Sequence, residues 1–209
     1  RMVYVSTFHI DRHEVTRRDY YSCVAAKRCP APPTPPQIKA MWRDDAPVLG
    51  VTWGEAAAFC KWRGKRLPTE AEWEKAARGP FGRIWPWGDR WAAKRCNHGN
   101  LNPVTRAFEG DGADGFHWIA PIKSFLGGRS FYGVAGLAGN AAEWVADRYA
   151  ARRFRKRSAL INPRGPKTGS YRVLKGGSWY GPRFLTRAAS RLSYPPHKRE
   201  SFIGFRCAR

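Results

Sequence analysis

Residues 64–79 read GKRLPTEAEWEKAARG and carry the most specific structural signal in the chain. Thr69 is followed three residues later by Glu72, which is the capping-box pattern found at the start of a helix. A glycine directly after the last periodic residue marks the end of a helix. We therefore predict a helix over residues 70–78 that Gly79 closes. Its expected apolar face consists of Ala71, Trp73 and Ala77.

The N-terminal side of this segment predicts two more helices. Thr16 is a suitable N-cap, and Asp19 in the first turn suits the positive end of a helix. Residues 54–63 (GEAAAFCKWR) predict another helix, which ends at a glycine. Upstream, residues 2–15 alternate like a strand. Residues 29–36 (CPAPPTPP) predict a surface loop, because proline lacks the backbone donor that a helix or central strand needs.

The C-terminal side has a different texture. Residues 80–140 are rich in Gly, Pro, Asn and Asp, yet their tryptophans need packing partners, so we expect ordered loops. Residues 148–157 (RYAARRFRKR) form a basic cluster. Residues 171–179 are expected to form a strand that runs into a turn, and residues 202–206 to form a final strand. Helices early and irregular β-structure late favour an α+β fold.

Length and composition predict one ordered domain over residues 1–209. Hydrophobic residues make up 43% and aromatic residues 14%, which a disordered chain would not carry. The chain opens at Arg1 inside a strand-like pattern, so we expect a short upstream segment to be missing. No apolar run reaches the about 18 residues of a membrane span.

The net charge is extreme, at +22 with an isoelectric point near 10.6. Such a surface attracts anionic partners, although charge of this kind also serves solubility alone. We expect nucleic acid to bind only non-specifically.

Five cysteines, an odd number, leave at least one thiol unpaired. Cys23 and Cys29 bracket a short loop, which favours a local disulfide between them. No Cys-x-x-Cys or paired Cys/His spacing suits zinc. Our candidate for the unpaired thiol is Cys96. Disulfides form in oxidising compartments, so the cysteines favour an extracytoplasmic or secreted protein.

Several segments match one known family in sequence, order and spacing more closely than chance allows. They are HEVT (13–16), PVLGVTWGEAAAFCKW (47–62), GKRLPTEAEWEKAARG (64–79), WPWG (85–88), DGF (114–116), GNAAEW (139–144), VLKGGSW (173–179) and GFRCAR (204–209). Across almost the whole chain they resemble the formylglycine-generating-enzyme, or sulfatase-modifying-factor, family. The resemblance implies a C-type-lectin-like fold that is loop-rich, has few regular elements and places its two terminal strands side by side. It also implies a disulfide between Cys60 and Cys207.

Calcium is a further implication of the resemblance, because family members hold Ca²⁺ with loop oxygens, which suit this hard cation. One site maps onto Asn97, the His98 carbonyl, Asp114 and the Phe116 carbonyl. A second maps onto the Gly139 and Ala141 carbonyls and Glu143. The family places Asn or Asp three residues before the GN pair, where this chain has Gly136, and this departure weakens the second site.

The family's oxidase binds copper through two thiolates shortly after the GGS turn, and a soft thiolate pair selects Cu(I). Here the first position aligns with Gly181 and the second falls near Thr186. No cysteine lies anywhere between Asn97 and Arg206. We therefore expect no copper and no oxidase chemistry. The histidines show no facial-triad spacing, as an iron-dependent sulfoxide synthase would need, and no GxSxG nucleophile motif appears.

Residues 179–203 (WYGPRFLTRAASRLSYPPHKRESFI) are rich in Tyr, Phe, Arg and Ser, the side chains that recognition surfaces use. This arrangement resembles the variable proteins of diversity-generating retroelements. We therefore predict a non-catalytic module that binds a protein or glycan, with an anionic partner favoured by the charge. The candidate contacts are Trp179, Tyr180, Phe184, Ser190, Ser193, Tyr194, His197, Glu200 and Phe202.

Two alternatives remain open at this point. In the first, the chain is a catalytically inactive family member whose loop only packs against its own fold. In the second, it is a sulfatase-modifying oxidoreductase or an accessory factor of such an enzyme.

Overall fold

The structure is a computed structural model that describes residues 3–33, 43–110, 112–151 and 160–209. Within these ranges the α-helices lie in the N-terminal half: α1 (Arg17–Ala25), α3 (Trp53–Trp62) and α4 (Glu70–Arg78). Short 3-10 turns follow at η1 (Ala93–Arg95), η2 (Leu126–Gly128) and η3 (Arg183–Thr186).

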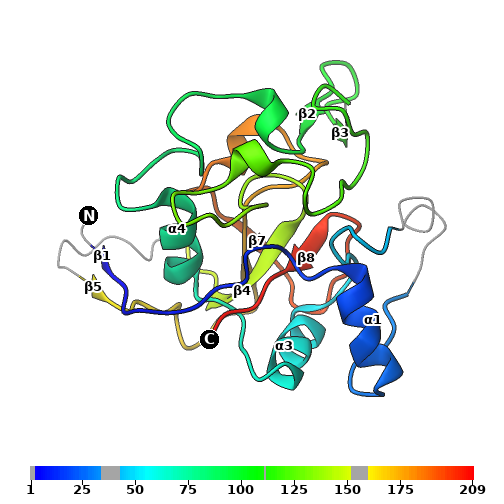
Figure 1. The fold of residues 1–209 in the computed structure, drawn as a ribbon, viewed down its shortest axis with the longest axis vertical. Coiled ribbons are helices and arrows are strands. Elements are labelled where there is room, and N and C mark those ends of the chain that lie inside the picture. The colour runs from blue at the N-terminus through cyan, green and yellow to red at the C-terminus, as the bar shows by residue number, and fades with distance from the viewer. Residues whose placement is uncertain (1–2, 34–42, 111, 152–159) are drawn as a thin grey trace.

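A central sheet with strand order β7-β6-β4-β8 organises the fold (Figure 1). The strands β6 and β4 pair antiparallel, as do β6 and β7, whereas β4 and β8 run parallel. Two smaller two-stranded sheets, β1-β5 and β2-β3, lie outside it. The strands are β1 (Val3–Tyr4), β2 (Gly99–Leu101), β3 (Phe108–Gly110), β4 (Ala142–Arg148), β5 (Leu160–Ile161), β6 (Arg172–Lys175), β7 (Leu192–Tyr194) and β8 (Ile203–Phe205).

This arrangement confirms the predicted α+β, loop-rich, C-type-lectin-like fold. Figure 1 shows α1 and α3 at one end of the central sheet and β2 and β3 at the other. Helix α4 packs against β4 and β6. In the described part of the segment 80–140, the regular elements are short 3-10 turns and the β2-β3 pair, as its composition predicts.

Local capping signals account for the helix positions. Both α3 and α4 begin with complete capping boxes, formed by Thr52 with Glu55 and by Thr69 with Glu72. The structure confirms the predicted bounds of α4 and starts α3 one residue earlier than predicted, at Trp53.

The buried face of α4 differs from the prediction. Ala71 is only half-buried, whereas Glu70 and Glu72 are buried beside Trp73 and Ala77. Both carboxylates have arginine partners, and Arg66 donates to both oxygens of Glu72 at 2.7 Å. A buried charge of this kind requires a partner, and helical periodicity alone does not reveal one.

The main core lies between α1, α3 and the sheet and is largely aromatic. Tyr20 stacks on Phe59 with ring centroids 5.5 Å apart, and Phe205 meets Phe59 edge-on at the same distance. The Trp144 ring is fully buried, and its indole N–H donates to the Val51 carbonyl at 3.0 Å. These contacts fix the strands against the helices that precede them in the sequence.

The predicted long strand over residues 2–15 is wrong in detail, because among the described residues 3–15 only Val3–Tyr4 form a strand. The following residues run antiparallel beside the C-terminus without forming a regular ladder. His9 and Arg209 exchange backbone hydrogen bonds, and the Val15 N–H donates to the Phe205 carbonyl. The predicted juxtaposition of the terminal segments is therefore confirmed.

Both predicted C-terminal strands are present. In the segment 171–179, β6 covers Arg172–Lys175 before the chain turns, as expected, and in 202–206 β8 covers Ile203–Phe205, one residue shorter at each end. The first two residues, residues 34–36 of the proline-rich loop and residues 152–157 of the basic cluster lie outside the described residues. Among the described residues, no helix has the length and apolar composition that a membrane span needs.

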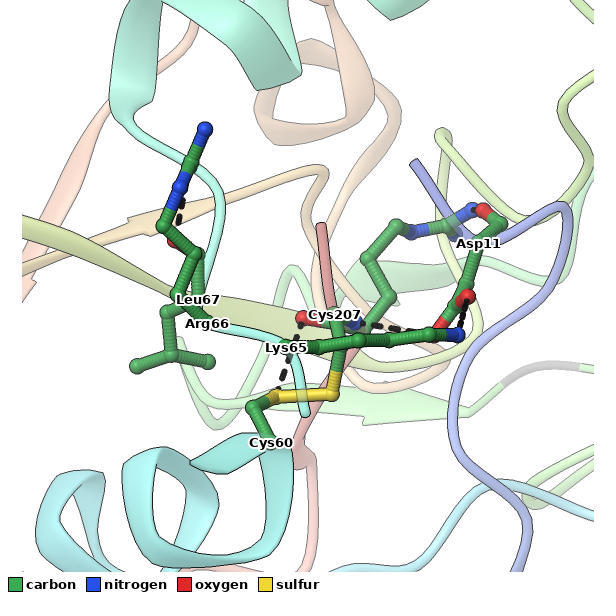
Figure 2. Close-up of a disulfide and its surroundings, with 7 residues drawn as sticks. Asp11, Cys60, Lys65, Arg66, Leu67 and Cys207 are labelled. Carbon is green, nitrogen blue, oxygen red and sulfur yellow. Dashed lines mark hydrogen bonds and ion pairs between the residues drawn. A yellow bond between two sulfur atoms is a disulfide. The ribbon is translucent and has the colours of Figure 1, made fainter. Parts of the chain in front are cut away.

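Both predicted disulfides are confirmed. The Cys23–Cys29 bond closes the turn after α1, and the Cys60–Cys207 bond joins α3 to the C-terminal segment across a separation of 147 residues. Figure 2 shows Cys60–Cys207 beside the ion pair between Lys65 and Asp11. The cysteine left over is the predicted one, Cys96, which is buried.

Candidate recognition surface and metal sites

Four of the predicted contact residues form one aromatic cluster. The rings of Tyr180 and Phe202 stack 5.8 Å apart at an angle of 14°, and Tyr194 meets Phe202 edge-on at 6.1 Å. Trp179 packs against Tyr180 at 5.4 Å but is only 4% exposed. Trp179 therefore supports the surface from below, while the other three rings are partly exposed.

A polar side chain completes this cluster. The Tyr194 hydroxyl donates to the Glu200 carboxylate at 2.7 Å. Burial, followed by this hydrogen bond and the negative charge of Glu200, raises the pKa of Tyr194 to about 12. The phenol therefore stays protonated at physiological pH, and it holds the carboxylate at the edge of the rings.

Sequence reasoning missed two members of the cluster. Phe108, in β3, meets Tyr180 edge-on at 6.2 Å, and Trp118 lies 5.4 Å from Trp179 with 53% of its surface exposed. Both come from the loop-rich segment 80–140, where the need of the tryptophans for packing partners was the available signal. We call the set Phe108, Trp118, Trp179, Tyr180, Tyr194 and Phe202 the aromatic surface.

The other predicted contacts do not join the aromatic surface by ring contacts. Phe184 is 53% exposed in η3, where its carbonyl accepts a hydrogen bond from the Ser190 hydroxyl at 2.8 Å. Ser193 lies in β7, paired with Val173 of β6. His197 is exposed in the turn that follows β7. The loop therefore presents an aromatic part and a separate part around η3.

The turn before this loop requires glycine. Gly177 has φ of +68°, and a β-carbon there would contact the backbone of Leu185 at 2.9 Å. At the next turn, the Gly99 N–H donates to the Gly181 carbonyl at 2.9 Å, which fixes β2 against the start of the loop. These contacts position the β2-β3 pair, and with it Phe108, at the edge of the aromatic surface.

The residues of the first predicted calcium site lie together. The Asp114 carboxylate accepts the backbone N–H groups of His98 at 2.6 Å and of Phe116 at 2.9 Å. Asn97 is fully buried, and its amide nitrogen donates to the Trp118 carbonyl and to the Asn140 side chain. Its Oδ1 is buried without a hydrogen-bond partner among the described residues. Asn97 therefore offers an unused oxygen, and the Asp114 carboxylate accepts the backbone N–H of the next residue, His98; oxygen donors of these kinds suit a hard cation.

The second predicted calcium site fits less well, because Glu143 is already engaged. Both of its oxygens accept from the Arg206 guanidinium at 2.7 Å, and Oε2 also accepts from the Trp73 indole at 2.9 Å. All of these groups are buried. The residues present therefore favour an internal cation, the guanidinium, at Glu143, and we propose no calcium there.

Gly136, at the position where the family has Asn or Asp, faces a second buried carboxylate. A β-carbon at Gly136 would collide with the carboxylate of Glu14, which occupies that space. Glu14 Oε1 accepts from the Asn140 side chain at 3.2 Å, whereas Oε2 lies 3.9 Å from the Arg206 guanidinium. Burial raises the pKa of Glu14 to about 7, although Arg206 opposes this effect.

The positions that align with the copper thiolates carry no sulfur. Thr186 is fully buried; its hydroxyl donates to the Arg183 carbonyl at 2.8 Å and accepts from the Trp85 indole at 3.2 Å. The Cys96 thiol forms a hydrogen bond with Thr186, and burial raises its pKa well above the usual range. A single protonated thiol does not provide the thiolate pair that copper requires, so these residues do not fit a copper site.

Comparison with known proteins places the chain among related domains. A family model described as a sulfatase-modifying factor enzyme 1-like domain matches residues 1–209. A formylglycine-generating enzyme of Bos taurus is 39% identical over 184 residues, covering 84% of this chain and 47% of the relative. An inactive C-alpha-formylglycine-generating enzyme 2 of Mus musculus is 36% identical over 193 residues, covering 83% and 56%.

The fold also matches a solved structure. Treponema denticola variable protein 1 superposes with a TM-score of 0.77 at 24% identity, covering 99% of this chain and 85% of that one. At this identity the match supports the fold alone. The chain spans about half the length of the curated relatives that it matches.

Proposed function

The chain belongs to the sulfatase-modifying factor enzyme 1-like family, and from that premise we propose that it is a non-catalytic module that binds a ligand or protein partner through residues 179–203 and the aromatic surface. A relative that is 36% identical is itself named as inactive. Membership of this family is thus compatible with a non-catalytic role.

The observation that most supports this proposal is the lack of a pair of free thiols. Two disulfides use four of the five cysteines, and Cys96 is a buried thiol with a raised pKa. Thiolates, not thiols, bind Cu(I) and act as nucleophiles. The chain therefore lacks the donor pair on which the oxidase chemistry of the family depends.

The aromatic surface has the chemistry of a recognition site. Tyr180 and Phe202 offer stacked, partly exposed ring faces, and Trp118 adds a half-exposed indole at the rim. Rigid aromatic side chains supply contact area at a small entropic cost. The net charge of +22 favours an anionic protein or glycan as the partner.

We place one calcium ion at Asn97 and Asp114 in this proposal. The unpartnered Asn97 Oδ1 and the Asp114 carboxylate would hold it, with the His98 and Phe116 carbonyls as further oxygens. The Asn97 amide also donates to the Trp118 carbonyl, so the ion would order the rim of the aromatic surface. The two disulfides support an extracytoplasmic location.

Titration with Cu(I) against a chromophoric chelator tests the non-catalytic role. The chain should leave all copper with the chelator. A positive control restores the missing sulfurs through Gly181→Cys together with Thr186→Cys. A β-carbon at Gly181 would meet the flexible end of Leu185 at 3.2 Å and Ser178 Oγ at 3.9 Å, so a side chain fits there with a small shift of Leu185. One tightly bound Cu(I) on the unmodified chain would contradict the proposal.

A glycan array tests the surface itself. The fluorescently labelled chain should bind anionic glycans, and Tyr180→Ala with Phe202→Ala should remove that binding. Phe131→Ala, at an exposed ring outside the aromatic surface, is the matched control. Glycan binding that survives in the double variant would show that glycans bind outside the aromatic surface. The partner of the aromatic surface would then be a protein.

The surface also suits a retroelement-diversified variable protein. A neighbouring reverse-transcriptase gene together with a second DNA segment that nearly repeats the codons of residues 176–206 would support this hypothesis. A genomic neighbourhood that contains neither would contradict it.

A further inference from the structure

A cavity lies at the C-terminal end of β4, next to Asp147 and Arg148. None of its lining residues belongs to 179–203 or to the aromatic surface. The cavity has a volume of about 520 Å³, within the range of sites that hold small molecules. Its lining residues come from α3, the segment before α4, the ends of β4 and β6, and the loop 164–167. The site is independent of the proposed function.

Two arginines face each other across the sheet inside this cavity. Arg148 of β4 and Arg172 of β6 are direct cross-strand partners, and both line the cavity. Like charges placed directly opposite each other destabilise a strand pair. Burial, and then the charge of Arg148, lower the pKa of Arg172. A bound anion would relieve this repulsion.

Contacts on two sides fix the Arg172 guanidinium, and one of its N–H groups has no hydrogen-bond acceptor among the described residues. Its Cζ lies 3.6 Å from the Trp53 ring centroid, and its NH1 donates to the Ala146 carbonyl at 2.7 Å. Its Nε is buried without a hydrogen-bond partner among the described residues. A fixed cation with an unused donor is the geometry that oxyanion recognition needs.

The remaining charges of the lining reinforce this preference. Lys61, Arg164 and Lys167 line the same cavity, and none of them forms an ion pair with a described acidic residue. The carboxylate in the lining is that of Asp147, which is buried and accepts the Glu70 N–H at 2.8 Å. The cavity therefore has a large excess of positive charge.

We infer that this cavity is a binding site for a small molecule carrying a phosphate or sulfate group, with Arg148 and Arg172 as the paired oxyanion donors. The apolar stems of the basic residues and the Trp53 ring provide a wall for the uncharged part of the ligand. A sugar phosphate or a sulfated monosaccharide has the appropriate size.

Isothermal titration calorimetry of the full chain tests this inference, with inorganic phosphate, inorganic sulfate and glucose 6-phosphate as probes at constant ionic strength. We expect saturable one-to-one binding of at least one probe. Arg148→Gln should weaken it by at least about tenfold, because a charge-assisted hydrogen bond is lost. The relative affinities of phosphate and sulfate distinguish the two oxyanion classes.

Arg90→Gln is the matched control, because it removes the same charge from an exposed residue that does not line the cavity. It should change the affinity by less than about twofold, since only long-range charge is altered. An equal loss in both variants, or no saturable binding of any probe, would overturn the inference.

A second readout does not depend on the ligand. Arg148→Gln removes the cross-strand repulsion and also the hydrogen bond that the Arg148 guanidinium donates to the Gly169 carbonyl, so the salt dependence separates the two effects. Without added phosphate or sulfate, the melting temperature of Arg148→Gln relative to the unmodified chain should be higher by about 1–3 °C at low ionic strength than in about 1 M sodium chloride, because salt screens the repulsion. Arg90→Gln should show no such difference. A salt-independent offset for Arg148→Gln would contradict the inference.

Discussion

Arg206 and Glu143 form a fully buried ion pair in which the guanidinium donates to both carboxylate oxygens at 2.7 Å. The two residues are 63 positions apart and connect the C-terminal segment to β4. The same guanidinium donates to the Ala135 carbonyl at 2.9 Å. One buried cation thus organises three segments of the chain.

Removing one partner of this pair should be costly. Glu143→Gln removes the carboxylate that holds the buried Arg206 guanidinium at 2.7 Å and leaves it Glu14, whose Oε2 lies 3.9 Å away, so the free energy of unfolding should fall by about 3 kcal/mol. Urea denaturation measures this change. Asp45→Asn, at the exposed Arg43–Asp45 pair, is the matched control and should cost less than about 1 kcal/mol. Equal effects at the two sites would show that burial of the pair is unimportant.

The two disulfides should contribute unequally to stability. They close loops with sequence separations of 147 and 6 residues, and loop-closure entropy rises with length. Replacing Cys60 and Cys207 together by serine should cost about 5 kcal/mol, against about 2 kcal/mol for Cys23 and Cys29. Denaturation of both double variants under oxidising conditions gives the comparison. A larger loss for the short loop would contradict the entropic account.

Glu14 should make stability depend on pH in the metal-free protein. Burial raises its pKa from the ordinary 4.5 to about 7, so the folded protein keeps a proton that the unfolded chain has released. Stability from this group therefore falls as the pH rises from about 4.5 to about 7, and it is constant above that range. The nearby charges are Arg206 and Glu143.

Glu14→Gln removes this titration. Relative to the unmodified chain, the variant should gain on the order of 3 kcal/mol between pH 5 and pH 8. Denaturation series in EDTA at both pH values measure the difference. A gap between the two proteins that does not change with pH would contradict the raised pKa.

Calcium should stabilise the folded chain through Asn97 and Asp114. A ligand at 100 times its Kd adds about 2.7 kcal/mol, so EDTA should lower the melting temperature. Asp114→Asn should abolish the response to calcium. Asp89→Asn is the control, since Asp89 also accepts a backbone N–H, from Ile84, yet does not belong to the site. Identical melting curves with calcium and with EDTA would contradict calcium binding at Asn97 and Asp114.

Local signals in the sequence predicted the local structure well. The capping box at Thr69 and Glu72 fixes α4, and proximity alone favours the Cys23–Cys29 bond. In contrast, alternation over 2–15 mispredicted a strand, because alternation does not reveal the path of the partner segment. The Cys60–Cys207 bond followed only from the family resemblance, since its two ends are far apart in the sequence.

The candidate sites show the same division. Tyr180 and Phe202 were predicted because one loop contains both, whereas Phe108 and Trp118 arrive from distant loops. The role of Glu14 was not foreseen, because a single acidic residue in a strand-like pattern reads as solvent-exposed. Its burial against Arg206 follows from packing that joins the two ends of the chain.

The proposal that this family member is non-catalytic is tested most directly by oxygen uptake of the copper-treated full chain with a cysteine-containing peptide, with a formylglycine-generating enzyme run in parallel. We predict uptake equal to that of buffer containing the same copper. Uptake that rises with protein concentration and stops when copper is chelated would contradict the proposal.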